Sequence, residues 1–115
     1  MGETYVIATV QGPAGVREVR LLVDSGAIYS LLPLDVWRGI GLEARRTQVF
    51  DLADGTEFER AVSECYMEIP QGGTTTPVIL GESGDAALLG LVTLEELGLA
   101  LHPLSRTLRK RLMRL

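Results

Sequence analysis

An aspartate that follows a run of aliphatic residues is the strongest candidate for chemistry in this sequence. Asp24 comes directly after Leu21-Leu22-Val23 and is followed by Ser25 and Gly26. The aliphatic run predicts a buried strand, and the Ser-Gly pair predicts a tight turn at its end. A carboxylate there is costly to bury unless hydrogen bonds compensate, and a glycine lets backbone approach it closely. This layout suits a carboxylate that acts as a general acid or base.

Other kinds of catalytic site find little support in the sequence. His102 is the single histidine and Cys65 the single cysteine, so neither a zinc cluster nor a Cys-His site is indicated. The sequence contains no nucleophile elbow, no phosphate-binding loop and no Gly-x-Gly-x-x-Gly motif. We therefore expect no metal and no cofactor, with His102 at the surface or in an interface. Catalysis by a carboxylate is the kind of site that the sequence still supports.

Length and composition predict one ordinary globular domain. The chain has 115 residues, of which 46% are hydrophobic and 23% charged. The lone Cys65 cannot form an internal disulfide, so no oxidising compartment is required. No apolar run reaches the length of a membrane span, and residues 1–5 lack a basic leader segment. The sequence thus favours a cytoplasmic protein that does not contact a membrane.

Charge is distributed unevenly along the chain. All 15 acidic residues precede residue 106, whereas the last ten residues hold five of the 11 lysines and arginines. We expect residues 106–115 to form a basic tail that packs Leu108, Leu112 and Leu115 against the acidic body or against a partner chain. Nucleic-acid binding is the alternative for such a tail. No aromatic residues are interleaved with these charges, so we expect no nucleic-acid partner.

The remaining pattern is dominated by short strands, which position the Asp24 turn. Alternating β-branched and apolar residues, separated by Gly, Pro and Asp-Gly turns, predict strands over residues 4–10, 16–23, 48–52, 56–69, 74–80 and 99–104. Residues 86–91 are expected to be a buried apolar run. A short helix is expected from Pro33 to about Gly39, and a clear one near the C-terminus from Thr93 to Leu97. Pro77 marks an edge or a bend, and Tyr29 and Trp37 are expected in the core. The fold class is therefore mostly β, a barrel of short strands.

These residues carry a resemblance to a known family. The segment from Leu22 to Ala27 resembles the active-site turn of the aspartic proteases, which is Asp-Thr/Ser-Gly after an apolar strand. Ala86-Ala87-Leu88-Leu89-Gly90, followed by residues 94–98, is similar to their second signature, an apolar pair and a glycine leading into a helix. The Asp54-Gly55 hairpin falls where the family carries its substrate-covering flap. The length resembles that of the retropepsin-like proteases, the half-length members that work as homodimers.

The resemblance implies a closed acid-protease barrel over residues 1–105, followed by the tail over residues 106–115. It implies that Asp24 is catalytic and that two copies of it, about 3 Å apart in a homodimer, share one proton. One chain supplies one such aspartate, because Glu82-Ser83-Gly84 predicts a loop. The other implied roles belong to three short segments: Ser25, Gly26 and Ala27 in the active-site turn; Ala53, Asp54 and Gly55 in a flap over an extended peptide or protein substrate; and Leu88, Leu89 and Gly90 as the core that supports the turn.

Some residues depart from the family pattern, and other interpretations stay open. The acidic flap tip at Asp54 would disfavour acidic substrates, and the basic tail replaces the short strand that joins viral dimers. Asp24 could also be a turn-capping residue without a catalytic role, and the Asp54-Gly55 turn an ordinary hairpin. The alternative function is a catalytically silent retropepsin-like dimer that binds peptides or acts as a scaffold.

Overall fold

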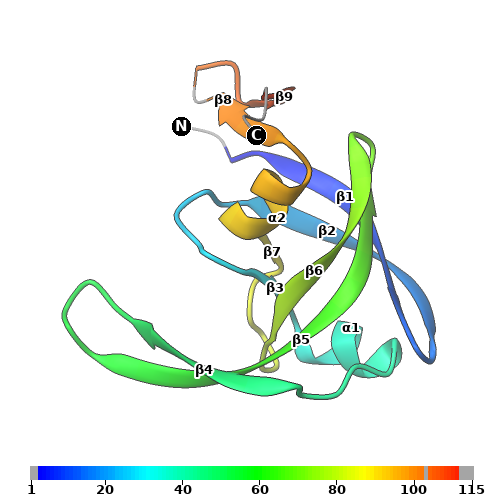
Figure 1. The fold of residues 1–115 in the computed structure, drawn as a ribbon, viewed down its shortest axis with the longest axis vertical. Helices are drawn as coiled ribbons and strands as arrows, with labels where there is room; N and C mark the ends of the chain where they lie inside the picture. Colours follow the sequence, from blue (N-terminus) through cyan, green and yellow to red (C-terminus); the bar gives the residue numbers. More distant parts are fainter. Residues whose placement is uncertain (1–2, 103, 112–115) are drawn as a thin grey trace.

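The chain forms a closed barrel of six strands from which a long hairpin projects (Figure 1). The computed structural model describes residues 3–102 and 104–111. Its strands and helices are, in chain order, β1 (Tyr5–Gly12), β2 (Gly15–Val23), β3 (Ser30–Leu32), α1 (Leu34–Gly39), β4 (Arg46–Asp51), β5 (Glu57–Ile69), β6 (Gly72–Leu80), β7 (Leu88–Leu89), α2 (Leu91–Glu96), β8 (Leu99–His102) and β9 (Thr107–Lys110). The prediction of a mostly β barrel is confirmed.

The barrel closes because β1 pairs with β5 as well as with β2. The order of the strands is β1-β2-β7-β3-β6-β5, and β4 lies outside this ring against β5. β1 and β2 form the predicted hairpin, with Tyr5 opposite Leu22 and Gly12 opposite Gly15. The inward positions on these two strands are Ala8, Val10, Leu21 and Val23, all buried. Alternation along each strand thus places one face in the core.

β7 lies between β2 and β3, and this insertion shapes the region around Asp24. It runs parallel to β2, with Leu22 opposite Leu88, and antiparallel to β3, with Leu31 opposite Leu88. The chain must therefore pass over β7 as it goes from β2 to β3. Residues 86–91 were expected to be a buried apolar run; only Leu88 and Leu89 form a strand, Ala86 is exposed, and α2 already begins at Leu91. β3 was not predicted, since three residues are too few to show a period.

β5 is long enough to take part in both the projecting hairpin and the barrel. Its first half pairs with β4, from Asp51 opposite Glu57 to Arg46 opposite Val62, and forms the projecting hairpin. Its second half pairs with β6 and β1 inside the barrel. The predicted Asp-Gly hairpin is therefore confirmed. Pro77 lies on β6 immediately before Val78, where pairing with β3 begins, so at this position β6 is paired with β5 alone.

Residues 3–102 and 104–111 form two short helices, α1 after Pro33 and α2 after Gly90. The fold class expected one helix near the C-terminus; α2 is that helix, and it begins two residues earlier than Thr93. α1 matches the helix expected up to Gly39. Among the described residues, neither helix is long and apolar enough to cross a membrane.

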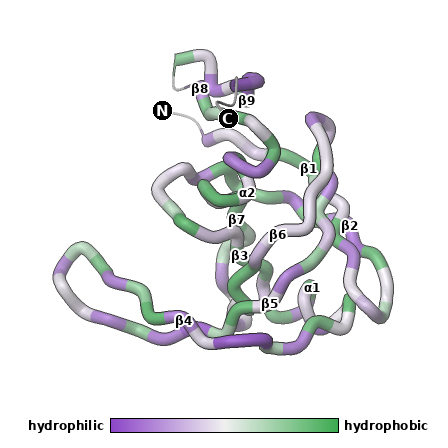
Figure 2. The backbone as a smooth tube through the Cα atoms, in the orientation of Figure 1, coloured by the Kyte–Doolittle hydropathy of each residue, from purple (hydrophilic) through white to green (hydrophobic). Residues whose placement is uncertain are grey.

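The core fills the barrel and extends under α1 and α2. Its largest fully buried aliphatic side chains are Leu21, Leu32, Ile40, Met67, Leu89, Leu94 and Leu99. Figure 2 shows hydrophobic residues gathered where β3, β7 and α2 meet, and hydrophilic residues along much of β4. Trp37 is partly buried against this core, and its Nε1–H donates to the carbonyl oxygen of Gly81 at 2.8 Å.

The C-terminal segment forms a second, two-stranded sheet. β9 pairs with β8, with Leu101 opposite Leu108, and Leu108 packs partly buried against the core. The strand expected over residues 99–104 ends earlier, at His102, and Leu104 lies in the turn with 91% of its surface exposed. β9 was not predicted. Leu112, Arg114 and Leu115, which we expected in the basic tail, lie outside the described residues.

Candidate active site around Asp24

Asp24 is held by three backbone hydrogen bonds at the end of β2. Its own N–H donates to the carbonyl oxygen of Leu89 at 3.0 Å, which ties the residue to β7. The Gly26 N–H donates to Asp24 Oδ1 at 3.0 Å, and the Ala27 N–H donates to the Asp24 carbonyl oxygen at 3.1 Å. Asp24 is half-buried, while Ser25 and Gly26 are exposed. The carboxylate is therefore oriented by the turn and open on one side.

The second predicted motif lies directly behind this turn. The Leu91 N–H donates to the carbonyl oxygen of Ala27 at 2.8 Å, and the Val92 N–H donates to that of Ile28 at 2.9 Å. Gly90 packs so closely that a Cβ there would lie 2.4 Å from the carbonyl carbon of Tyr29. The structure thus brings together Asp24 and the segment from Leu88 to Gly90, with Leu89 fully buried.

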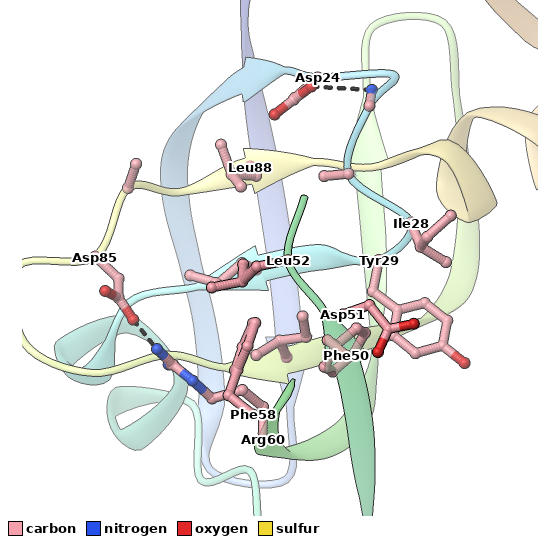
Figure 3. Close-up of a pocket in the computed structure, with 15 residues that line it drawn as sticks. Asp24, Ile28, Tyr29, Phe50, Asp51, Leu52, Phe58, Arg60, Asp85 and Leu88 are labelled. Atoms are coloured by element: carbon pink, nitrogen blue, oxygen red, sulfur yellow. Dashed lines mark hydrogen bonds and ion pairs between the residues drawn. The ribbon is translucent and has the colours of Figure 1, made fainter. Parts of the chain in front are cut away.

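A pocket of about 470 Å³ opens beside Asp24 (Figure 3). Its walls come from the Asp24 turn and β3, from the two arms of the projecting hairpin, and from the segment that leads into β7. The side chains are mostly apolar: Ala27, Ile28, Tyr29, Leu31, Phe50, Leu52, Phe58, Ile79, Ala86 and Leu88, with Asp24, Asp51, Arg60 and Asp85 as the charged members. A concave apolar site with a few polar groups is the usual form of a ligand site.

The projecting hairpin lines the pocket with its two arms and not with its tip. Ala53, Asp54 and Gly55, the predicted flap residues, lie exposed at the end of the hairpin and do not line the pocket. Asp54 accepts hydrogen bonds from the N–H and the hydroxyl of Thr56, and these bonds lower the pKa of its carboxyl. The Asp54 carboxylate is thus turned into its own hairpin end.

The arms supply aromatic side chains that were not among the predicted site residues. Phe50 and Phe58 are opposite each other on β4 and β5, with ring centroids 5.7 Å apart. A pair of aromatic residues at matching positions on either side of an Asp-Gly turn is a signal that could have identified them.

Tyr29 connects this aromatic pair to the segment that follows Asp24. Its ring meets Phe50 edge-on, with centroids 5.9 Å apart, and its hydroxyl accepts a hydrogen bond from Arg46 Nη2 at 2.9 Å. The prediction that Tyr29 belongs to the core is wrong, because Tyr29 is half-buried and lines the pocket.

Two charged residues that line the pocket, Arg60 and Asp85, form an ion pair. Arg60 Nη1 lies 3.1 Å from Asp85 Oδ2, which also accepts the Glu82 N–H at 2.7 Å. The Glu82 hydrogen bond and the Arg60 charge together lower the pKa of the Asp85 carboxyl. The Asp85 carboxylate is thus held by Arg60 and by the Glu82 N–H. Asp24, in contrast, has no cation as an ion-pair partner in the described part of the chain.

We expect the Arg60–Asp85 pair to make stability dependent on pH. Because the pKa of Asp85 is lower in the folded protein than its ordinary value of 3.8, its contribution is complete above that value and is lost as the pH falls through the folded-state pKa. Asp85→Asn should therefore lower the thermal midpoint near neutral pH and leave it almost unchanged in strong acid.

The measurement is a thermal midpoint at a series of pH values for the wild type and for Asp85→Asn. Asp35→Asn is the control, because Asp35 is largely exposed and lies 4.0 Å from Arg17. Exposed pairs of this kind contribute little to stability. A difference between wild type and Asp85→Asn that stays constant down to strong acid would contradict the expectation.

The described residues offer one carboxylate at the Asp24 turn and no evident metal site. No three His, Cys, Asp or Glu side chains among residues 3–102 and 104–111 cluster closely enough to hold a metal ion. Comparison with protein-family models and with curated proteins finds no match to this chain. Its function is therefore inferred from the site itself.

Proposed function

We propose that this chain is a retropepsin-like aspartic endopeptidase that works as a homodimer, with one Asp24 from each protomer in a shared site. The observation that supports this proposal best is the setting of Asp24. Its carboxylate is oriented by the Gly26 N–H, anchored through Leu89 to β7, and opens into an apolar pocket that the projecting hairpin bounds. An aspartate that merely capped a turn would need no such pocket.

The proposed reaction needs both carboxylates. Two carboxylates in contact cannot both ionise easily, so the pair holds one proton between them. The ionised member takes a proton from water while the water oxygen attacks the carbonyl carbon of the substrate. The protonated member serves as the acid, and the amide nitrogen is protonated as the C–N bond breaks. Because one chain offers one such aspartate, the second comes from a twofold-related copy.

The substrate we propose is an extended peptide or protein segment. The arms of the β4–β5 hairpin could close over such a segment and pair with its backbone, as in other cases of strand addition. Phe50, Phe58 and Tyr29 offer a wall for a large apolar side chain. Asp51 on the same side would disfavour acidic residues. We place the protein in the cytoplasm within this proposal, because Cys65 is a free, buried thiol.

Cleavage of a peptide mixture at several protein concentrations tests the proposal. We expect products that mass spectrometry assigns to internal bonds, and a rate per chain that rises with protein concentration until the dimer is saturated. A peptide that carries a secondary alcohol in place of the scissile amide should inhibit, because it mimics the tetrahedral intermediate.

Two results would contradict the proposal. If the rate per chain does not vary with protein concentration and the protein sediments as a monomer, the active site is not shared between two chains. Peptide binding without cleavage over the acidic to neutral range would support the alternative, a catalytically silent dimer that binds peptides.

A further inference from the structure

We infer that a buried chain of three hydroxyl groups, from Ser30, Thr93 and Thr76, positions the active-site turn of Asp24 for catalysis. This inference rests on the proposed function, because it assigns positioning residues to that site. None of the three side chains lines the pocket, so none can contact a substrate bound there. Their effect on the reaction must pass through the backbone they hold.

The three hydroxyls form a continuous chain in the interior of the barrel. Thr76 Oγ1 lies 2.8 Å from Thr93 Oγ1, which lies 2.6 Å from Ser30 Oγ. All three residues are fully buried. They come from three different elements, namely β6, α2 and β3. A buried hydroxyl without a partner is costly, so each member depends on the others.

The hydroxyl chain ends at the backbone N–H of Gly90, in the segment behind Asp24. The Gly90 N–H donates to Ser30 Oγ at 3.0 Å, and a hydroxyl can accept this bond while it still donates its own proton to Thr93. Gly90 follows Leu89, whose carbonyl oxygen accepts the Asp24 N–H, and precedes Leu91, whose N–H donates to Ala27. The hydroxyl chain therefore holds the peptide segment to which both ends of the Asp24 turn are attached.

This arrangement separates positioning from binding. A shift of Gly90 would move the Asp24 turn relative to its copy in the partner, while the pocket wall formed by the two arms of the projecting hairpin would stay in place. Small displacements of reacting groups lower the rate strongly, because the reacting atoms must be aligned. Loss of the hydroxyl chain should therefore lower kcat and leave KM unchanged.

Thr93→Val tests this inference, because valine has nearly the shape of threonine and lacks the hydroxyl. We expect a fall in kcat of between about ten- and a hundredfold with KM within twofold of the wild type. Thr93→Ser keeps the hydroxyl and should recover most of the lost kcat. Thr75→Val is the matched control, because Thr75 is the exposed neighbour of Thr76 on β6 and should behave as the wild type.

Amide hydrogen exchange gives a second readout that does not depend on activity. Thr93→Val should speed exchange of the Gly90 and Gly26 amides, and Thr93→Ser should not. If Thr93→Val fails to fold, Ser30→Ala removes the acceptor of the Gly90 N–H with a smaller change in volume and takes its place. If the wild type cleaves no peptide, the proposed function fails, and the exchange rates alone decide the positioning inference. Unchanged exchange at both glycines, or a kcat loss that serine does not recover, would overturn it.

Discussion

Asp24→Asn is expected to lower kcat/KM for peptide cleavage by about a thousandfold or more, because the change removes both the base and the acid of the proposed dimer. Asparagine keeps the size of the side chain, and its Oδ1 can still accept the hydrogen bond from the Gly26 N–H. The fold should therefore be retained. The measurements are kcat/KM on a cleaved peptide, and the thermal midpoint and circular dichroism of the same preparation.

A second carboxylate of the same pocket supplies the control. Asp51 lines the pocket from β4 and is exposed, so Asp51→Asn should stay within a few-fold of the wild type in kcat/KM. Equal loss in Asp24→Asn and Asp51→Asn would point to the charge of the pocket rather than to catalysis by Asp24. Full activity of Asp24→Asn would refute the proposed role.

Mixed dimers extend this experiment to the shared site. If each active site needs two intact copies of Asp24, an equal mixture of wild type and Asp24→Asn that has exchanged subunits should keep about a quarter of the activity of undiluted wild type, since pairing is random. Half of the activity would instead mean that each chain acts alone.

Gly90→Ala is expected to destabilise the fold strongly, although it adds a single methyl group. A Cβ at Gly90 would lie 2.4 Å from the carbonyl carbon and 2.6 Å from the carbonyl oxygen of Tyr29, and 2.7 Å from the nitrogen of Ser30. All three are backbone atoms of the peptide unit that leads into β3, and they cannot move without disturbing the pairing of β3, which begins at Ser30. We expect the free energy of unfolding to fall by about 3 kcal/mol.

Urea unfolding of Gly90→Ala and of Gly39→Ala measures this effect against a control. A Cβ at Gly39 would meet the end of the Arg17 side chain at 2.9 Å, and this flexible, half-exposed side chain can shift at the cost of its hydrogen bond to the Asp35 carbonyl oxygen. Gly39 lies in α1, where alanine is a better helix former than glycine, so the change should remain within about 1 kcal/mol of zero. Equal midpoints for the two variants would show that the packing behind the Asp24 turn is looser than the structure indicates.

Local patterns in the sequence were enough to predict the hairpins and the Asp24 turn. Apolar residues before Asp24, and Asp54-Gly55 between alternating arms, are signals carried by neighbouring residues. The motif from Leu88 to Gly90 was placed correctly behind the turn through the resemblance to the aspartic proteases. For the hairpins and the Asp24 turn, the predictive pattern lies within a few neighbouring residues. For the motif from Leu88 to Gly90, it lies in the order of three segments along the chain.

The remaining features depend on contacts between distant segments. β3 and β9 are short strands whose existence depends on partners elsewhere in the chain, namely β6 and β7 for β3, and β8 for β9. Aromatic residues are often buried, which favours a core position for Tyr29, but Arg46 and Phe50 hold it at the pocket. The tip of the hairpin carries the conspicuous Asp-Gly, while the phenylalanines on its arms line the site. Such placements follow from tertiary packing, which overrides local preference.

The central claim is that two copies of Asp24 meet, and a crystal structure of the protein bound to the secondary-alcohol peptide measures this directly. We predict that the nearest carboxylate oxygens of the two Asp24 residues lie about 3 Å apart across a twofold axis, with the hydroxyl of the inhibitor in contact with both. An inhibitor bound in the pocket of a single chain, with the Asp24 carboxylates separated in every assembly of the crystal, would contradict the shared site.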